Sequence, residues 1–430
     1  MRSNPDRVGK GVASSEGTGR NWFILGGGPA GFFAALRAAE LDPTACVTLL
    51  EGAPEVLGKV RISGGGRCNL TNACSDPLEL ASHYPRGSRE LPGPFSRFSS
   101  RDTLQWFHRR GVKTVVEGDG RVFPATHDSL TIVTCLLEAA QRAGVDIRTG
   151  HAVDDLQPPS GSISHWTVRA GRQVFKAHRV VVATGSEPVL WRCLAGMGHR
   201  LIRPVPSLFS FQIQNPLLEG LAGLSIPLAE VSIPAFHLTQ RGPILITHWG
   251  LSGPAILCLS AWGARDLAES GYRVELRVNW LGESEAALRE QLLAFQTGHA
   301  RKQAATHPAG SLPVRLWQRL AISAGIPPGR PWAQVGRQPI AALLRQLTAT
   351  SFLVQGKGPH REEFVTAGGL DLKDVNCETF ESRIHPGLFI VGEALNIDAV
   401  TGGYNFQAAW TTGYLAGTAL ASGATQFGSR

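Results

Sequence analysis

A glycine-rich turn near the start of the chain reads Gly26-Gly27-Gly28-Pro29-Ala30-Gly31 and fits the pattern G-x-G-x-x-G. An apolar strand is predicted before it at Trp22–Leu25, and an alanine-rich helix after it at Phe32–Glu40. A second apolar run, Val47–Leu50, then ends at Glu51. This strand–turn–helix–strand unit, with an acidic residue about 20 residues past the last glycine, is the arrangement of a dinucleotide site.

Each glycine of the pattern has a physical role in that interpretation. Gly26 allows the tight turn, Gly28 lets the backbone approach a pyrophosphate, and Gly31 lets the helix pack close to the strand. The N-terminus of the helix offers N–H groups to the phosphates, and Glu51 would accept hydrogen bonds from a ribose diol. Glycine is common in this chain, at 50 of 430 residues, so an ordinary glycine-rich turn is the alternative. The flanking strands and the placed acid favour the dinucleotide site.

Composition limits the class of protein. A chain of 430 residues with 43% hydrophobic residues can form two or three domains. Because no apolar stretch approaches ~18 residues, we expect no membrane span. Residues 1–20 are polar and lack the apolar centre of a secretory signal, which predicts a disordered tail. Seven scattered cysteines without a C-x-x-C pair argue against a disulfide framework and a metal site, and favour a cytoplasmic location.

The chain is basic, with a formal charge of +8 and a pI near 9.4. A basic balance is typical of proteins that contact nucleic acid or membranes. Lys and Arg form no run of five or six, and aromatic residues are not interleaved with them. We therefore interpret the charge as arginine spread over a solvated surface, and we expect a small-molecule substrate with no nucleic-acid or membrane partner.

Changes in residue pattern along the sequence predict a domain whose two parts are separated in the chain. Residues 21–195 alternate strands with helices, and this character returns in residues 355–430. Residues 196–283 are rich in proline and contain Tyr272–Trp280, which alternates as a half-buried strand does. Residues 284–354 favour helices, with Ser284 as an expected cap. The predicted fold is α/β, a Rossmann-like domain carrying an inserted β-rich domain and a helical subdomain.

Three further segments accompany the opening turn. Val181–Gly185 is a buried strand that turns at Thr184-Gly185, and Val391-Gly392-Glu393 places a carboxylate at the end of another strand. Open α/β sheets bind ligands at such strand ends. Gly402-Gly403 opens the last helix, where N–H groups can stabilise negative charge. A buried parallel strand and a solvated strand end remain the plainer interpretations of the first two.

The order of these segments resembles that of the two-dinucleotide-binding-domain flavoproteins. The resemblance is sharpest at Ser63–Asn72, Gly120–Pro124, Thr247–Pro254 and Val400–Phe406. Together they are similar to a bacterial family of FAD-binding oxidoreductases of aminoacetone-oxidase-like or bile-acid-reductase-like type, over residues 21 to about 420. The resemblance implies a noncovalently bound FAD, a β-barrel-like insert and a helical subdomain.

The resemblance also implies a set of cofactor-binding residues. The pyrophosphate and ribose would be held by the opening turn and Glu51, and Val153 would contact the adenine edge. The predicted set is Gly26, Gly28, Pro29, Ala30, Gly31, Glu51, Lys59, Gly65, Gly66, Arg67, Asn69, Val153, Thr184, Gly185, Gly392, Glu393, Gly403, Tyr404, Asn405 and Phe406. Lys59 would pair with a phosphate, although an exposed loop lysine is an equally ordinary interpretation.

Proton donors and redox cysteines are less clearly indicated. His248 and Tyr404 are weak candidates for a proton donor, with a packed histidine and a core tyrosine as the plainer interpretation. Cys68 and Cys74 have five residues between them, and we interpret them as unpaired thiols. A second G-x-G-x-x-G is not visible after Gly185, so NAD(P)H would reach the flavin by another route.

These features predict an FAD-dependent oxidoreductase that exchanges hydride between flavin N5 and a small organic substrate. The substrate would lie between the FAD domain and the insert. NAD(P)H-driven reduction of an unsaturated ketone is the leading hypothesis. The alternatives are oxidation of a small amine with release of peroxide, a non-catalytic redox sensor, and an RNA-modifying flavoenzyme, which only the pI suggests.

Overall fold

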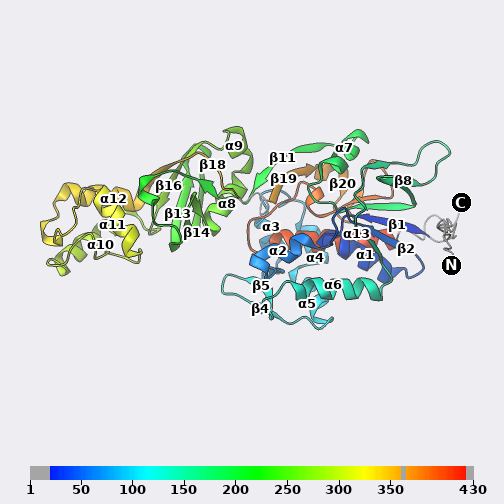
Figure 1. Cartoon of the computed structure of the whole chain (residues 1–430), viewed down its shortest axis with the longest axis horizontal. Coiled ribbons are helices and arrows are strands. Elements are labelled where there is room, and N and C mark those ends of the chain that lie inside the picture. The colour runs from blue at the N-terminus through cyan, green and yellow to red at the C-terminus, as the bar shows by residue number, and fades with distance from the viewer. Residues whose placement is uncertain (1–19, 360–364, 423–430) are drawn as a thin grey trace, which may run out of the picture.

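The computed structural model describes residues 20–359 and 365–422. The tail expected at residues 1–20 therefore lies outside the described residues, except for Arg20. Figure 1 shows an α/β body at one end of an elongated molecule, a group of helices at the other end and a second sheet between them. The α/β class predicted from the sequence is confirmed.

The body is built on a seven-stranded sheet in the order β20-β21-β22-β10-β1-β2-β6. Five neighbouring strands, β22 to β6, run parallel. Parallel strands with both faces covered are continuously apolar, which is why β1 and β10 were recognisable as buried runs. The strands are β1 (Asn21–Leu25), β2 (Cys46–Leu50), β6 (Asp146–Arg148), β10 (Arg179–Val182), β20 (Val375–Asn376), β21 (Glu381–Ser382) and β22 (Leu388–Ile390).

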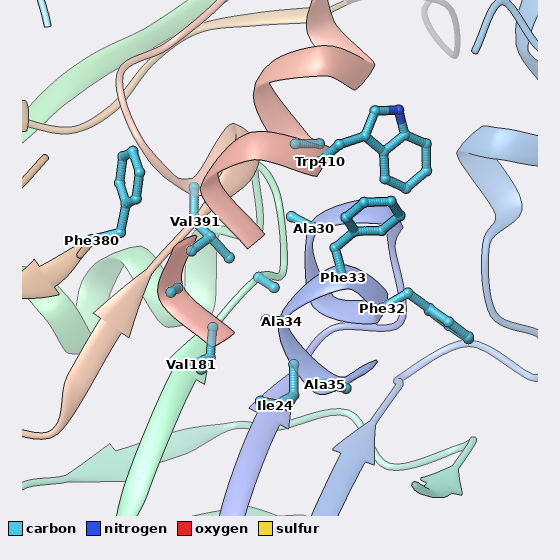
Figure 2. Packing of buried hydrophobic residues seen from close by; sticks show 14 of the residues in the cluster. Ile24, Ala30, Phe32, Phe33, Ala34, Ala35, Val181, Phe380, Val391 and Trp410 are labelled. Carbon is cyan, nitrogen blue, oxygen red and sulfur yellow. The ribbon is translucent and has the colours of Figure 1, made fainter. Parts of the chain in front are cut away.

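Helices α1 (Pro29–Leu41) and α13 (Tyr404–Ser422) pack against each other in the body. A Cβ added at Gly413 would lie 2.3 Å from the carbonyl oxygen of Ala30, so the two backbones touch. Figure 2 shows Phe33 of α1 facing Trp410 of α13, with ring centroids 4.6 Å apart. The chain's first and last helices are thus joined in one core.

Smaller elements surround this sheet. A three-stranded meander and a second three-stranded sheet carry short helices and the loops that reach the site. These elements are α2 (Gly58–Ile62), α3 (Pro77–Ser82), α4 (Pro92–Arg97), α5 (Ser100–His108), α6 (Leu130–Arg142), α7 (Pro188–Gly196), β3 (Thr71–Asn72), β4 (Thr114–Val116), β5 (Arg121–Pro124), β7 (Asp155–Gln157), β8 (Trp166–Ala170) and β9 (Gln173–Ala177).

The second sheet is antiparallel, in the order β17-β16-β13-β14-β15-β12-β18. Helices α8 (Pro254–Trp262) and α9 (Ala264–Glu269) accompany it, and the pair β11 (Leu201–Ser207) and β19 (Val365–Leu370) joins it to the body. The strands are β12 (Phe211–Gln212), β13 (Ser225–Ile233), β14 (Leu238–Thr247), β15 (Gly250–Ser252), β16 (Val274–Asn279), β17 (Thr350–Val354) and β18 (Gly356–Lys357).

Three helices form the far end of the molecule: α10 (Glu285–Gly298), α11 (Val314–Ser323) and α12 (Arg337–Ala349). Ser284 caps α10 by accepting a hydrogen bond from the N–H of Ala287, as its sequence position predicts. The strands β17 and β18 follow and pair within the antiparallel sheet. The predicted boundary between the helical subdomain and the FAD-binding domain, at residues 354 and 355, therefore differs from the observed pairing, because both strands belong to the antiparallel sheet. The alternating pattern of β17 is only five residues long and directly follows a helical pattern, so the sequence does not reveal it.

Candidate functional site

A cavity of about 1170 Å³ lies at the carboxyl ends of the parallel strands of the body and extends to the antiparallel sheet. Ligand sites of open α/β sheets occupy this edge. Its lining includes the segments that follow four strands and several residues of the insert. They are Gly26–Ala30, Leu50–Ala53, Glu55, Leu57–Lys59, Ile62–Gly65, His151–Asp154, Ala183–Gly185, Glu187, Val189, Leu190, Leu208, Ser210, Trp249, Ser252, Leu257, Gly358, Val365, Gly392, Glu393, Ile397, Thr401, Asn405, Phe406, Ala408 and Ala409.

The glycines of the turn have two different roles, close packing inside the protein and an open approach to the cavity. A Cβ at Gly31 would lie 2.0 Å from the carbonyl oxygen of Gly26, and one at Gly26 would lie 2.5 Å from that of Ala183. These two glycines therefore allow backbone contacts inside the protein. Gly28 differs, since a Cβ there would meet no heavy atom within 4 Å. Its backbone faces open cavity, which fits the close approach of a pyrophosphate.

Glu51 fixes the glycine turn from the next strand. Its carboxylate accepts a hydrogen bond from the N–H of Gly27 at 2.7 Å and another from the N–H of Ala53 at 2.8 Å. Val153 lines the cavity in the same region. The carboxylate oxygens keep further lone pairs for a ribose, so the predicted contact stays compatible with this second role, which sequence reasoning missed.

A carboxylate from the end of β22 closes the other side of the turn. Glu393 forms an ion pair with Lys59 and accepts a hydrogen bond from the N–H of Thr366 at 3.0 Å. Lys59, expected to meet a phosphate, is thus engaged by Glu393, although its side chain is 58% exposed. Thr184 also lines the cavity, and its buried hydroxyl has no hydrogen-bond partner within residues 20–359 and 365–422. An unpartnered buried hydroxyl beside a cavity is explained by a ligand there.

The Ser63–Asn69 loop reaches the cavity only in part. Gly64 and Gly65 line it, but Gly66, Arg67 and Asn69 do not. Arg67 turns away, forming an ion pair with Glu117 at 2.8 Å and lying 4.1 Å above the ring of Phe123. In the described geometry these side chains support the loop and do not contact the ligand space, which differs from our expectation.

The start of the last helix divides in the same way. Asn405 and Phe406 line the cavity, whereas Gly403 and Tyr404 lie outside it. With its amide oriented to suit both neighbours, Asn69 accepts a hydrogen bond from the N–H of Gly403 at 2.9 Å. The Asn405 side chain accepts from the N–H of Ala399 at 2.9 Å and donates to its carbonyl oxygen at 3.1 Å. At the start of the last helix, the side-chain amides of Asn69 and Asn405 are therefore engaged by backbone groups.

Neither weak proton-donor candidate lies on the described cavity wall. Tyr404 is buried and stacks on His83 with ring centroids 4.2 Å apart, and burial raises the pKa of its hydroxyl. His248 is exposed in the turn between β14 and β15. The cavity contacts its neighbour Trp249 instead. A packed tyrosine and a surface histidine account for both residues.

Sequence reasoning missed the part of the cavity that comes from the antiparallel sheet. We call it the insert wall, and it consists of Leu208, Ser210, Trp249, Ser252, Leu257 and Gly358. The Ser210 hydroxyl donates to the Ser252 hydroxyl at 2.6 Å, and the N–H of Gly358 donates to the Ser210 carbonyl at 2.7 Å. Only Trp249 and Ser252 belonged to a quoted motif, because the other members come from distant parts of the chain.

A buried ion pair joins the body to the insert beside this wall. Asp398 is fully buried and is paired with Arg86 through both carboxylate oxygens. Arg86 also donates to the carbonyl of Ala261 in α8 at 2.7 Å, and Ser207 of β11 donates to Asp398 at 2.8 Å. Ile397, next to Asp398, lines the cavity. The ion pair therefore fixes the loop that closes the site against the insert.

All seven cysteines are free, and burial raises the pKa of Cys68 to about 12 and that of Cys74 to about 11. Thiols of this kind are poor nucleophiles at neutral pH. Across residues 20–359 and 365–422 there is no group of three metal-ligating side chains and no helix apolar and long enough to cross a membrane.

Comparison with known proteins identifies the family. A model described as the HI0933-like protein Rossmann domain matches residues 20–419. The chain belongs to this family. The expected enzyme class, an FAD-dependent oxidoreductase with a Rossmann-type domain, is thereby confirmed, and FAD is the cofactor that the open glycine turn fits.

Curated relatives span nearly the whole chain. A 3-dehydro-bile acid delta(4,6)-reductase of Clostridium scindens is 30% identical over 93% of this chain and 98% of its own length. A ribosomal RNA dihydrouridine synthase of Escherichia coli is 27% identical over 91% and 95%. A solved flavocytochrome c3 fumarate reductase in its open conformation is 15% identical, with a TM-score of 0.48, over 95% of this chain and 79% of that one. Because the name of the second relative includes ribosomal RNA, the expected absence of a nucleic-acid partner is not supported.

Proposed function

We propose that the protein reduces a carbon–carbon double bond conjugated to a carbonyl group, using bound FAD and NAD(P)H as the electron donor. The observation that carries this proposal is the cavity that extends from the glycine turn to the insert wall. The names of both curated relatives describe the addition of hydrogen to carbon–carbon double bonds, in a bile acid and in uridine. The two names therefore describe the same type of reaction on different substrates.

Residues of the body would hold the cofactor. The backbone at Gly28 is open to the cavity, Glu51 holds the turn in place, and the hydroxyl of Thr184 lacks another partner in the described chain. The N-terminus of α1 would offer its N–H groups and the positive end of its dipole to the pyrophosphate. When bound, FAD supplies a two-electron carrier that accepts and gives hydride.

The insert wall would hold a neutral conjugated substrate. Leu208, Trp249 and Leu257 offer apolar and aromatic surface. Because the Ser210 hydroxyl donates to Ser252, the Ser252 hydroxyl hydrogen is left to donate to a substrate carbonyl oxygen. Such a hydrogen bond stabilises negative charge that develops on that oxygen as hydride adds to the conjugated carbon.

Oxidation of a small amine is supported less well by this wall. A protonated amine is best held by a carboxylate or an aromatic cage. None of the six residues of the insert wall carries a carboxylate. Glu393, on the opposite side of the cavity, already pairs with Lys59.

The proposal is tested on the purified flavoprotein under anaerobic conditions. NADPH should bleach the visible flavin absorption, and a cyclic conjugated ketone or uridine monophosphate should then restore it while gaining two hydrogens by mass spectrometry. Peroxide formation from a primary amine, without bleaching by NADPH or NADH, would overturn the proposal and favour the oxidase. Redox-dependent binding of a partner without turnover of any probe would favour the sensor.

A further inference from the structure

Nearly all of the chain's excess positive charge lies in one segment. Residues 291–349 contain seven Arg and Lys residues and no Asp or Glu. The whole chain has a formal charge of +8, so the rest of the sequence is close to neutral. The seven cations are Arg301, Lys302, Arg315, Arg319, Arg330, Arg337 and Arg345. Only seven of the chain's 42 Arg and Lys residues lie here, so these cations are spread along the sequence, and the segment is distinguished by its lack of acidic residues.

All seven cations are exposed, and they belong to the group of helices at the far end of the molecule (Figure 1). Arg315 and Arg319 of α11 are used within the fold, since they donate to the carbonyl oxygens of Gly220 and Glu219. Cations without acidic neighbours repel one another, which disfavours the compact state. The excess of positive charge in this segment therefore favours a polyanionic partner.

Three of the cations lie where two loops of this module pair, although 28 positions separate the first from the last. The N–H of Ala304 donates to the carbonyl of Arg330, and the N–H of Trp332 donates to that of Lys302. These bonds hold the two loops side by side. We call Arg301, Lys302 and Arg330 the tip cluster. The two backbone hydrogen bonds between the loops fix the backbone of this cluster, while its side chains are exposed to solvent.

A stacked ring pair, the half-buried Phe295 and the exposed His299, precedes the tip cluster in the sequence. His299 stacks on Phe295 with ring centroids 3.9 Å apart and an angle of 15° between the rings. Phe295 in turn packs edge-on against the buried Trp332, at 5.6 Å. Phe295 therefore supports the ring of His299. His299 is exposed and lies two residues before Arg301 in the sequence. Flat rings beside cations match the way proteins stack unpaired RNA bases and hold the phosphates on either side.

We propose that the tip cluster and His299 form a docking surface for RNA. Phosphates would pair with Arg301, Lys302 and Arg330, and an unstacked base would lie on His299. RNA is favoured over an acidic protein or an anionic membrane because the exposed ring of His299 offers a stacking surface for a nucleobase beside the cations. With the proposed function, on which this step rests, the substrate becomes a uracil base carried by RNA, whose ring contains the required conjugated double bond.

The test measures binding of an RNA hairpin with a uridine-containing loop to the full-length holoenzyme across a series of salt concentrations. Arg301→Gln/Lys302→Gln/Arg330→Gln should weaken binding at least tenfold and reduce the slope of log Kd against log salt by about 2. The matched control is Arg172→Gln/Lys176→Gln/Arg192→Gln, which removes three exposed cations of the body and should leave Kd within twofold.

A second variant separates RNA from other polyanions. His299→Ala should weaken binding of the hairpin about fivefold and leave binding of heparin unchanged, because heparin has no base to stack. Equal effects of the two triple variants, or equal affinity of wild type for the hairpin, polyglutamate and anionic vesicles, would overturn the proposal.

The two proposals fail separately. The tip variants should keep their FAD and still reduce the cyclic ketone, because their changes lie far from the cavity. RNA binding without reduction of any conjugated probe would refute the reductase and leave the docking surface. Reduction without RNA binding would refute the docking surface alone.

Discussion

The two ends of the cavity are made in different ways. At the glycine end the contiguous segment Gly26–Ala30 brings backbone to the surface, beside the segments that follow β2, β10 and β22. At the insert end side chains form the surface, and they come from segments as far apart as Leu208, Trp249 and Gly358. A backbone surface can change little without breaking the fold, whereas a side-chain surface can change residue by residue. The first end suits a constant cofactor and the second a substrate that varies among relatives.

The largest effect is expected at the ion pair that joins the two ends. Arg86→Met removes the cation and leaves the carboxylate of Asp398 buried without its charge partner, which should lower the free energy of unfolding by about 3–5 kcal/mol. Urea unfolding followed by fluorescence measures this. The matched variant Arg86→Met/Asp398→Asn also removes the buried charge and should recover a large part of the loss.

The same ion pair predicts a dependence on pH. Burial raises the pKa of Asp398 above its ordinary value, and Arg86 opposes that rise. In Arg86→Met the folded state would hold the proton more tightly than the unfolded chain, so the variant is stabilised at acidic pH and loses that stability as pH rises through the raised pKa. Its deficit relative to wild type should therefore be smaller at about pH 5 than at about pH 8. A constant deficit would refute the buried-charge explanation.

Two glycines of the same turn are expected to separate folding from cofactor binding. Gly31→Ala places a methyl group 2.0 Å from the carbonyl oxygen of Gly26, so the helix and the turn must move apart. We expect a loss of roughly 2–3 kcal/mol in the free energy of unfolding. Thermal unfolding of the apoprotein measures it. An apoprotein as stable as wild type would show that the contact relaxes without cost.

Gly28→Val is the contrasting change. The backbone at Gly28 has an extended conformation, with φ −84° and ψ −176°, and its added side chain would meet only open cavity. The apoprotein should therefore keep its stability, while the Kd for FAD rises about 100-fold, or about 2.7 kcal/mol. Titration of apoprotein with FAD, followed by flavin fluorescence, checks this. Tight FAD binding by this variant would mean that the pyrophosphate lies elsewhere.

The contrast also explains what the sequence could predict. The motif at Gly26–Gly31 and the strand that ends at Glu393 could be recognised because each is a short contiguous pattern with one backbone geometry. The discontinuous body followed from the return of apolar strands near β22. Asn69 and Arg67 were predicted to bind the cofactor; in the described structure Arg67 pairs with Glu117 and Asn69 with the N–H of Gly403, since a motif identifies a segment without the direction of its side chains.

The insert wall and the tip cluster could not be predicted for a related reason. Ser210 and Ser252 meet only through strand pairing in the antiparallel sheet, and Lys302 and Arg330 only through a loop ladder. Such pairings depend on register, which short strands specify weakly in a single sequence. The acid-free segment at residues 291–349 is visible as composition, but its cations are scattered and form no contiguous run of charge.

The smallest expected effect concerns the insert end and tests the division directly. Trp249→Leu removes aromatic surface from the insert wall, so the KM for the cyclic ketone should rise about tenfold, equivalent to about 1.4 kcal/mol. FAD content should stay at the wild-type level, because the glycine end is untouched. His248→Ala is the matched control, since its exposed side chain adjoins Trp249 but lies off the described wall. Steady-state kinetics in which His248→Ala lost kcat while Trp249→Leu behaved as wild type would restore His248 as the proton donor and refute the assignment of the wall to the substrate.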